Sequence, residues 1–173
     1  MGLDQFLSAK KFISGSQWST DYERRLHADI ISAVNAPSIV DTECPYITVD
    51  ITIAQWRKAN AIHNWFVDNV QNGNDDCGKY SVTHEELWDL HAQCVYVLGA
   101  FAEGETIDGE WVSERGIDYA QRYLPTTEGF FFGGTQYDES YLENLRYTKD
   151  ILYKVLIDLI PNKGWVFEYS SSC

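Results

Sequence analysis

The chain has 173 residues, of which 45% are hydrophobic and 14% aromatic, and this is enough for one domain with a substantial core. Disordered chains are poor in aromatic residues, so the composition excludes an intrinsically disordered protein. The formal net charge of -13 disfavours direct binding to nucleic acid, because phosphate backbones are also negative. No apolar run approaches membrane-spanning length, and Met1 to Phe6 fits neither a signal peptide nor a lipidation motif. We therefore expect no membrane partner.

The first half of the chain predicts two strands and two helices. Residues 3–13 mix apolar and polar side chains in rough alternation and predict a short strand. Residues 19–34 repeat an apolar side chain every fourth position after Ser19 or Thr20, which predicts a capped helix. Residues 46–52 alternate, with Ile47, Val49 and Ile51 on one face, and are the clearest strand. Residues 53–71 then take a helical period, with a core-facing stripe made of Ala59, Ile62, Phe66 and Val70.

The second half predicts two more helices and two short strands. Thr83 and Glu86 form a capping box that opens a helix to about Phe101. Residues 102–118 are acidic, rich in glycine and aperiodic, as in an exposed loop or loose hairpin. Residues 129–134 resemble a short buried strand, residues 135–159 a long helix, and residues 165–169 a last strand. We expect a single α+β domain over residues 1–173, with a small, mainly antiparallel sheet and about four helices packed mainly on one side.

The negative charge is concentrated in the middle of the chain. Residues 61–120 hold 12 acidic residues against Lys79 and Arg115, so this third carries 2 − 12 = -10. One interpretation is a solvated face that keeps the protein soluble. The other is a surface for a host protein with a basic surface, in which the acidic residues of the 102–118 loop take part: Glu103, Glu105, Asp108 and Glu110.

The four cysteines give no sign of a disulfide framework. Cys44, Cys77, Cys94 and Cys173 lie far apart, without a CxxC pair or the cysteine density of small secreted domains. Free thiols and a reducing cytosol are the expectation. Asp75 and Asp76 would raise the pKa of a neighbouring thiol, which disfavours Cys77 as a nucleophile.

The first candidate ligand site lies in the predicted helix 53–71. At 100° per residue, Trp56, Asn60, His63 and Val67 share a strip that is separate from the apolar stripe, with Arg57 and Asn64 on its flank. Such groups suit a pocket that stacks a flat ring and binds an anion. In the competing interpretation, Trp56 borders the core, His63 is a half-buried histidine with its hydrogen bonds satisfied, and Arg57 pairs with a nearby acid.

The second candidate site is a glycine turn that leads into the predicted helix 135–159. Free backbone N–H groups at that helix start could hold a phosphate or carboxylate. An ordinary turn and helix cap is the competing interpretation, since no Walker lysine or GxGxxG spacing is present. The residues concerned are Thr126, Thr127, Gly133, Gly134, Thr135 and Tyr137.

Motifs for catalysis, metals and cofactors are missing from the sequence. We find no GxSxG, HExxH, DxDxDG or Walker pattern. His84 and His91 are seven residues apart and could touch one metal only loosely, so a surface helix with histidines is the better interpretation. No cofactor and no metal are expected.

Several sequence blocks resemble a family of small uncharacterised proteins of tailed bacteriophages and prophages. These blocks cover about a third of the chain: the MGLD start with Ala9-Lys10-Lys11, the WRKANAIHNWFV block at 56–67, Asp76-Cys77-Gly78, and the LPTTEGFFFG block at 124–133 with Tyr137-Asp138-Glu139. The resemblance implies a phage accessory gene expressed in the cytoplasm of a bacterial host. It implies nothing about activity, and the 102–118 loop is longer than the family leads us to expect.

Three functions compete at this level. The first is a non-catalytic phage protein that binds and neutralises a host component, above all an anti-phage defence factor. The second is a protein that binds a small, nucleotide-like anion, as a sponge for a signalling molecule. The third is an enzyme that uses His63 as acid or base, and the lack of catalytic motifs makes it the weakest of the three.

Overall fold

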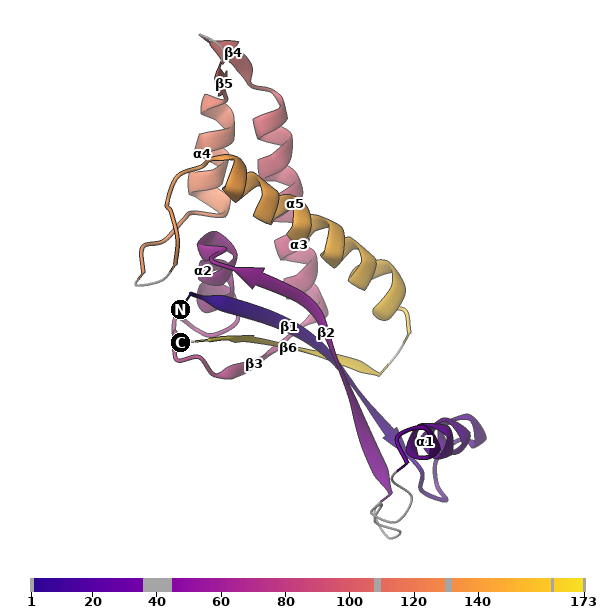
Figure 1. Ribbon diagram of the computed structural model, residues 1–173. Coiled ribbons are helices and arrows are strands. Elements are labelled where there is room, and N and C mark those ends of the chain that lie inside the picture. The colour runs from indigo at the N-terminus through magenta and orange to yellow at the C-terminus, as the bar shows by residue number, and fades with distance from the viewer. Residues whose placement is uncertain (1, 36–44, 108–109, 130–131, 163, 173) are drawn as a thin grey trace.

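The structure, a computed structural model, describes residues 2–35, 45–107, 110–129, 132–162 and 164–172. A four-stranded antiparallel sheet in the order β2-β1-β6-β3 is its centre, and β4 and β5 form a separate small hairpin (Figure 1). The strands are β1 (Asp4–Ser14), β2 (Tyr46–Arg57), β3 (Lys79–Val82), β4 (Glu105–Ile107), β5 (Glu110–Val112) and β6 (Trp165–Ser171). The helices are α1 (Asp21–Ala33), α2 (Asn60–Asn69), α3 (His84–Ala102), α4 (Glu114–Tyr123) and α5 (Glu139–Lys154), which continues as a π-helical turn, η1 (Val155–Leu159).

The helices α2, α3 and α5 cover one face of the sheet. The side chains of β1 alternate, and Gln5, Leu7 and Ala9 are buried on the helical side. Between helix and sheet, the rings of Phe66 and Tyr169 stack with their centroids 3.9 Å apart. The expected α+β fold, with one mainly antiparallel sheet and helices on one side, is confirmed.

The boundary between strand and helix near residue 58 differs from the prediction. Residues 53–57 do not begin a helix, because they extend β2: Gln5 pairs with Trp56 and Asp4 with Arg57. The register shifts between Leu7 and Ser8, where β2 carries Ile53 as an extra residue. Pairing with β1 therefore overrides the helical period of this segment, and α2 begins only at Asn60. The predicted stripe is nevertheless correct, since Ala59, Ile62 and Phe66 are buried and Val70 packs at its end.

Two elements were not expected. Residues 102–118 include the β4–β5 hairpin, in agreement with a loose hairpin, but from Glu114 the chain is helical, with Ser113 as the N-cap of α4. The short strand β3 pairs with β6. In the segment 129–134, Phe132 is not in a strand, and Phe130 and Phe131 lie outside the described residues.

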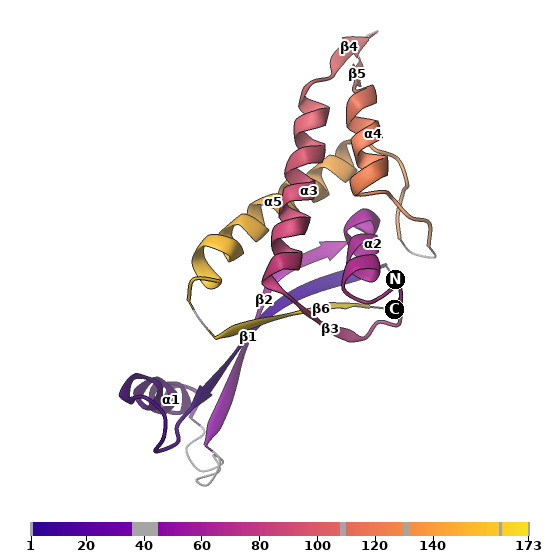
Figure 2. The same cartoon turned by 180° about the vertical axis from the view of Figure 1, so that it is seen from behind.

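An arm projects from the main body. Residues 12–14 of β1 extend beyond the end of β6 and pair with β2 alone, and α1 lies at the far end of this ribbon (Figures 1 and 2). Thr20, one of the two residues expected as the N-cap, caps α1 in a capping box. The apolar residues that recur along α1 do not pack into a core, because Tyr22 and Val34 are exposed. His27 is the only buried residue of this helix.

The cysteines differ from the expectation of free thiols. Cys94 is free and buried in α3, and burial raises the pKa of its thiol. Cys77, however, is bonded in a disulfide, so the expectation is wrong for this residue. Cys44 and Cys173 lie outside the described residues. None of the helices in the described ranges has both the length and the apolar character needed to cross a membrane.

Candidate functional site

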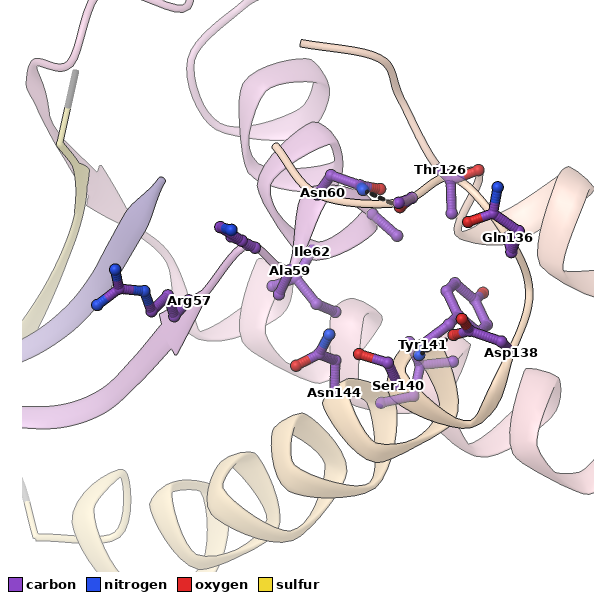
Figure 3. A pocket seen from close by; sticks show the side chains of 15 residues that line it. Arg57, Ala59, Asn60, Ile62, Thr126, Gln136, Asp138, Ser140, Tyr141 and Asn144 are labelled. Carbon is purple, nitrogen blue, oxygen red and sulfur yellow. Dashed lines mark hydrogen bonds between the residues drawn. The ribbon is translucent and has the colours of Figure 1, made fainter. Parts of the chain in front are cut away.

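A cavity of about 210 Å³ lies between the start of α2, the start of α5 and the loop before α5 (Figure 3). It brings together segments some 70 residues apart in the chain. The cavity is lined from the β2–α2 junction and from the segments on its other side: Arg57, Lys58, Ala59, Asn60, Ala61 and Ile62, and Thr126, Gly133, Gly134, Gln136, Asp138, Ser140, Tyr141, Asn144 and Leu145.

The junction between β2 and α2 is held in place by a buried glutamine of β1. The Gln5 side chain donates to the Ala59 carbonyl oxygen at 2.9 Å and accepts from the Ala59 N–H at 3.3 Å. The Lys58 N–H donates to the Leu3 carbonyl oxygen at 2.8 Å. Lys58 itself has a φ of 58°, a left-handed conformation that residues other than glycine adopt rarely. Strained residues of this kind cluster at functional sites.

The start of α2 has no side-chain cap. Its N-cap is Ala59, which has no side-chain acceptor. Among the described residues, no acceptor is found for the backbone N–H groups of Asn60, Ala61 and Ile62, although all three residues are buried. The other four α-helices of the described ranges are each capped by a side chain. The three amides of α2 therefore belong to residues that line the cavity, and no described residue supplies an acceptor for them.

Asn60 fixes the loop that closes the cavity. Its side-chain amide donates to the carbonyl oxygens of Phe132 at 3.2 Å and Gly134 at 2.7 Å, and its oxygen accepts from the Thr127 N–H at 3.3 Å. Gly133, between these two carbonyls, has a φ of 91°, and a Cβ there would lie 3.1 Å from the Lys58 Cβ. Only glycine fits this close approach at this φ. Asn60 is thus a clamp between helix and loop.

The opposite wall belongs to α5. Asp138 caps this helix by accepting from the Tyr141 N–H at 3.1 Å. The side chains of Ser140 and Asn144, one turn apart, point from α5 towards the cavity (Figure 3). The Tyr141 hydroxyl donates to the Leu124 carbonyl oxygen at 3.0 Å, and burial raises the pKa of this phenol, so it stays neutral.

Two cations stand at the β2–α2 junction. The Lys58 side chain is exposed, and its ammonium has no hydrogen bond or ion pair with any described residue. The Arg57 side chain is 67% exposed, lies 4.0 Å from the Asp4 carboxylate, and points away from the centre of the cavity (Figure 3). Arg57 instead borders a second, open groove with Gln55, Asn144 and Tyr147, which adjoins the cavity. Asp138 is the carboxylate in the cavity wall, and it is engaged as a helix cap.

The two predicted ligand sites meet in part. Arg57 and Asn60 from the first and Thr126, Gly133 and Gly134 from the second line the same cavity. Thr127, Thr135 and Tyr137 do not line it, and they support the loop instead. The Thr127 N–H donates to Asn60, the Thr135 carbonyl oxygen accepts from the Thr126 hydroxyl, and the Tyr137 ring contacts that of Tyr141.

The predicted strip of Trp56, Asn60 and His63 does not exist as an accessible face. Trp56 belongs to the strand, is buried, and donates through its indole N–H to the Thr148 hydroxyl at 2.8 Å. Asn64 lies on α2 and donates to Asp68. The competing interpretation, in which Trp56 borders the core, is closer to the structure.

His63 is a structural residue. Its side chain is 1% exposed, its Nδ1 lies 2.8 Å from the Tyr169 hydroxyl, and its Nε2 lies 3.1 Å from Asp75 Oδ2. The contact between Nε2 and Asp75 is close but lacks the geometry of a hydrogen bond. Burial also raises the pKa of the Tyr169 phenol. Because His63 does not line the cavity, the expectation of an accessible His63 is wrong.

Some cavity residues were missed from the sequence. Lys58, Gln136, Ser140 and Asn144 carry no motif, and only their position in the fold identifies them. Asp138 could have been found, because an aspartate directly before a helical segment is a common N-cap.

The acidic residues proposed for partner binding are only partly described. Glu103 is exposed but pairs with Arg115, and Glu105 is exposed in β4. Glu110 belongs to β5, and Asp108 lies outside the described residues. Within the described ranges, no group of three or more His, Cys, Asp or Glu residues could hold a metal ion.

Comparison of the chain with protein-family models, with curated proteins and with solved structures finds no match.

Proposed function

We propose that the protein is a non-catalytic binding protein that holds a small anion at the start of α2. One observation carries the proposal: the buried first turn of α2 has no cap, and its residues line a cavity. Free N–H groups and the positive end of the helix dipole form an anion site. The Lys58 ammonium, which has no partner among the described residues, adds positive charge to this site in a chain with a net charge of -13.

The size of the cavity defines the part of a ligand that it would hold. Pockets that enclose whole drug-sized ligands measure roughly 300–1,000 Å³. A cavity of about 210 Å³ suits a phosphate or carboxylate group instead. The adjoining groove offers Arg57 and the half-exposed ring of Tyr147, on which the flat ring of a nucleotide-like ligand would stack. The site would thus take the phosphate in the cavity and the base in the groove.

In a phage setting, such a protein would act by sequestering a host signalling molecule and so disarming a defence system. The resemblance to phage proteins supports this setting, and the bacterial cytosol is the compartment it implies. The disulfide of Cys77 supports an oxidising compartment instead, because disulfides are rare in the cytosol. Alkylating free thiols in intact cells before mass spectrometry decides between the two: a modified Cys77 supports the cytosol, and a protected Cys77 contradicts it.

Isothermal titration with inorganic phosphate, followed by a panel of nucleotides, tests the proposed ligand class. We expect saturable binding to the wild type that Lys58→Gln weakens about tenfold, the equivalent of 1.4 kcal/mol. Lys154→Gln removes another exposed lysine, at the far end of α5, and is the matched control. Ser140→Phe should fill the cavity and abolish binding.

Two results would contradict this proposal. One is the absence of binding by any anion of the panel. The other is equal weakening by Lys58→Gln and Lys154→Gln, which would indicate a general charge effect in place of a site.

A further inference from the structure

The outer edge of β2 exposes a row of backbone hydrogen-bonding groups. The Lys58 N–H donates to the Leu3 carbonyl oxygen and the Gly15 N–H to the Pro45 carbonyl oxygen, so the odd residues of β1 turn their backbone groups towards β2. In the register of the two strands, these residues face Ile47, Val49 and Ile51. The intervening residues must turn their N–H and C=O groups outward: Tyr46, Thr48, Asp50 and Thr52.

This edge is free over residues 46–52 of the described chain. Further along, the Gln55 N–H donates to the Tyr147 hydroxyl at 3.2 Å, so α5 covers that end. At the other end, α1 packs against β1 and lies on the far side of the ribbon from the β2 edge (Figures 1 and 2). None of the backbone groups turned outward between Tyr46 and Thr52 has a partner among the described residues.

The edge lacks the features that normally prevent strands from pairing. Natural edge strands carry lysines, prolines or bulges. Residues 46–52 contain neither lysine nor proline, and the bulge at Ile53 comes only after them. Their single charge, Asp50, lies 3.7 Å from the ammonium of Lys10. The strand is therefore an open template for another extended strand.

The sequence of the edge is nearly symmetric about Val49. It reads Ile-Thr-Val-Asp-Ile from Ile47 to Ile51, so the apolar residues are the same in both directions. When two such strands pair antiparallel about Val49, Val49 lies opposite Val49 and Ile47 opposite Ile51 of the second copy. Thr48 then exchanges backbone hydrogen bonds with Asp50, and the two aspartates do not face each other.

The apolar side chains and the local charge also fit a second copy. Ile47 and Val49 are half-buried and Ile51 is 43% exposed, so pairing would cover their free surface. The paired stretch itself carries little charge, since Asp50 is the only charged residue in 46–52 and lies opposite Thr48 of the second copy in this register.

We propose that the protein is a homodimer in which the β2 strands of two copies pair antiparallel about a two-fold axis at Val49. This pairing joins the two four-stranded sheets into one continuous sheet. Because both bodies are acidic, added salt screens their repulsion and strengthens the dimer.

Analytical ultracentrifugation of Thr48→Pro tests the pairing. Proline removes the outward N–H of Thr48 and leaves the hydrogen bonds between β1 and β2 intact. We expect a dimeric wild type, and a dimer dissociation constant at least about tenfold higher for Thr48→Pro. Thr48→Val keeps the N–H and should remain dimeric, as should Ser81→Pro, which makes the same change on the exposed residue of the opposite edge strand, β3. A monomeric wild type at every concentration overturns the proposal.

Cross-linking tests the register and does not depend on the folding of a proline variant. Directly opposed residues that do not exchange hydrogen bonds have their Cβ atoms about 4.5–5.5 Å apart, close to disulfide reach. Val49→Cys should therefore give a reducible dimer under mild oxidation. Val166→Cys places an exposed thiol on β6 as the matched control and should stay monomeric on a non-reducing gel. Equal cross-linking of both variants, or of neither, contradicts the pairing.

Discussion

The helices α2 and α3 begin in similar places in the fold but differ in how their N-termini are capped. Both helices follow directly after a strand of the same sheet, α2 after β2 and α3 after β3. At α3, the Thr83 hydroxyl accepts from the Glu86 N–H, and the Glu86 carboxylate accepts from the Thr83 N–H at 2.6 Å. At α2, Ala59 stands in the cap position and offers no acceptor.

The burial of the two helix starts makes this difference informative. Thr83, His84 and Glu85 are exposed, so water could satisfy the first amides of α3 without a cap. Asn60, Ala61 and Ile62 are buried, and their amides are the ones that need an acceptor. The helix start that reaches solvent is capped, whereas the one beside the cavity is not. The difference is what we expect if, as proposed above, a bound anion supplies the acceptor for α2.

The largest expected effect concerns the two histidines near these helix starts. His63→Ala should lower the free energy of unfolding by about 2–4 kcal/mol, because it opens a cavity and removes the hydrogen bond between the ring and the Tyr169 hydroxyl. His84→Ala, on the exposed first turn of α3, should stay within about 0.5 kcal/mol. Urea denaturation of both variants measures this contrast. Similar values would show that α2 is not anchored through His63.

The next effect concerns the clamp at the start of α2. Asn60→Ala removes three hydrogen bonds to the 127–134 loop and should cost about 2–3 kcal/mol. It should also abolish phosphate binding, since the loop closes the cavity. Asn64→Ala, one turn later, removes a side-chain hydrogen bond to Asp68 and is the control, which should cost about 0.5 kcal/mol or less. Intact binding by Asn60→Ala would place the anion elsewhere.

The cap of α3 should contribute less. Thr83→Ala removes the capping hydroxyl and should cost about 1 kcal/mol, whereas Thr83→Ser keeps the oxygen and should cost little. Thermal denaturation of the three proteins distinguishes them. Phosphate should stabilise all three proteins equally. A loss of this stabilisation in Thr83→Ala would contradict the proposal that the anion binds at the start of α2 and not at the start of α3.

The smallest expected effect on stability has the opposite sign. Lys58 has a left-handed backbone, so Lys58→Gly should relieve strain and raise stability by up to about 1 kcal/mol. The same change removes the free ammonium and should weaken phosphate binding. Titration calorimetry and denaturation of one preparation measure both. Unchanged affinity would show that the ammonium does not contribute to the site.

Local rules predicted the parts of the fold that depend on neighbouring residues. Alternation located the strand at 46–52, and the Thr83–Glu86 box located the start of α3. The start of α2 was placed too early because pairing between Trp56 and Gln5, far apart in the chain, decides the conformation there. The role of His63 depends on Tyr169, a partner 106 residues away.

The candidate site was predicted only in part for the same reason. Arg57, Asn60 and Gly133 were identified by residue type, and they do line one cavity. Ser140 and Asn144 are ordinary helix residues whose place in the wall depends on how α5 packs against α2. No pattern within one segment reports that packing. A missing cap at Ala59 is visible in the sequence only after the start of the helix is known.

The most direct test is an NMR titration of the backbone amides with inorganic phosphate. If an anion caps α2, the N–H signals of Asn60, Ala61 and Ile62 should shift strongly and saturate at one common ligand concentration. The signals of His84, Glu85 and Glu86 at the capped start of α3 should stay in place. Shifts of equal size at both helix starts, or none at α2, would contradict the account.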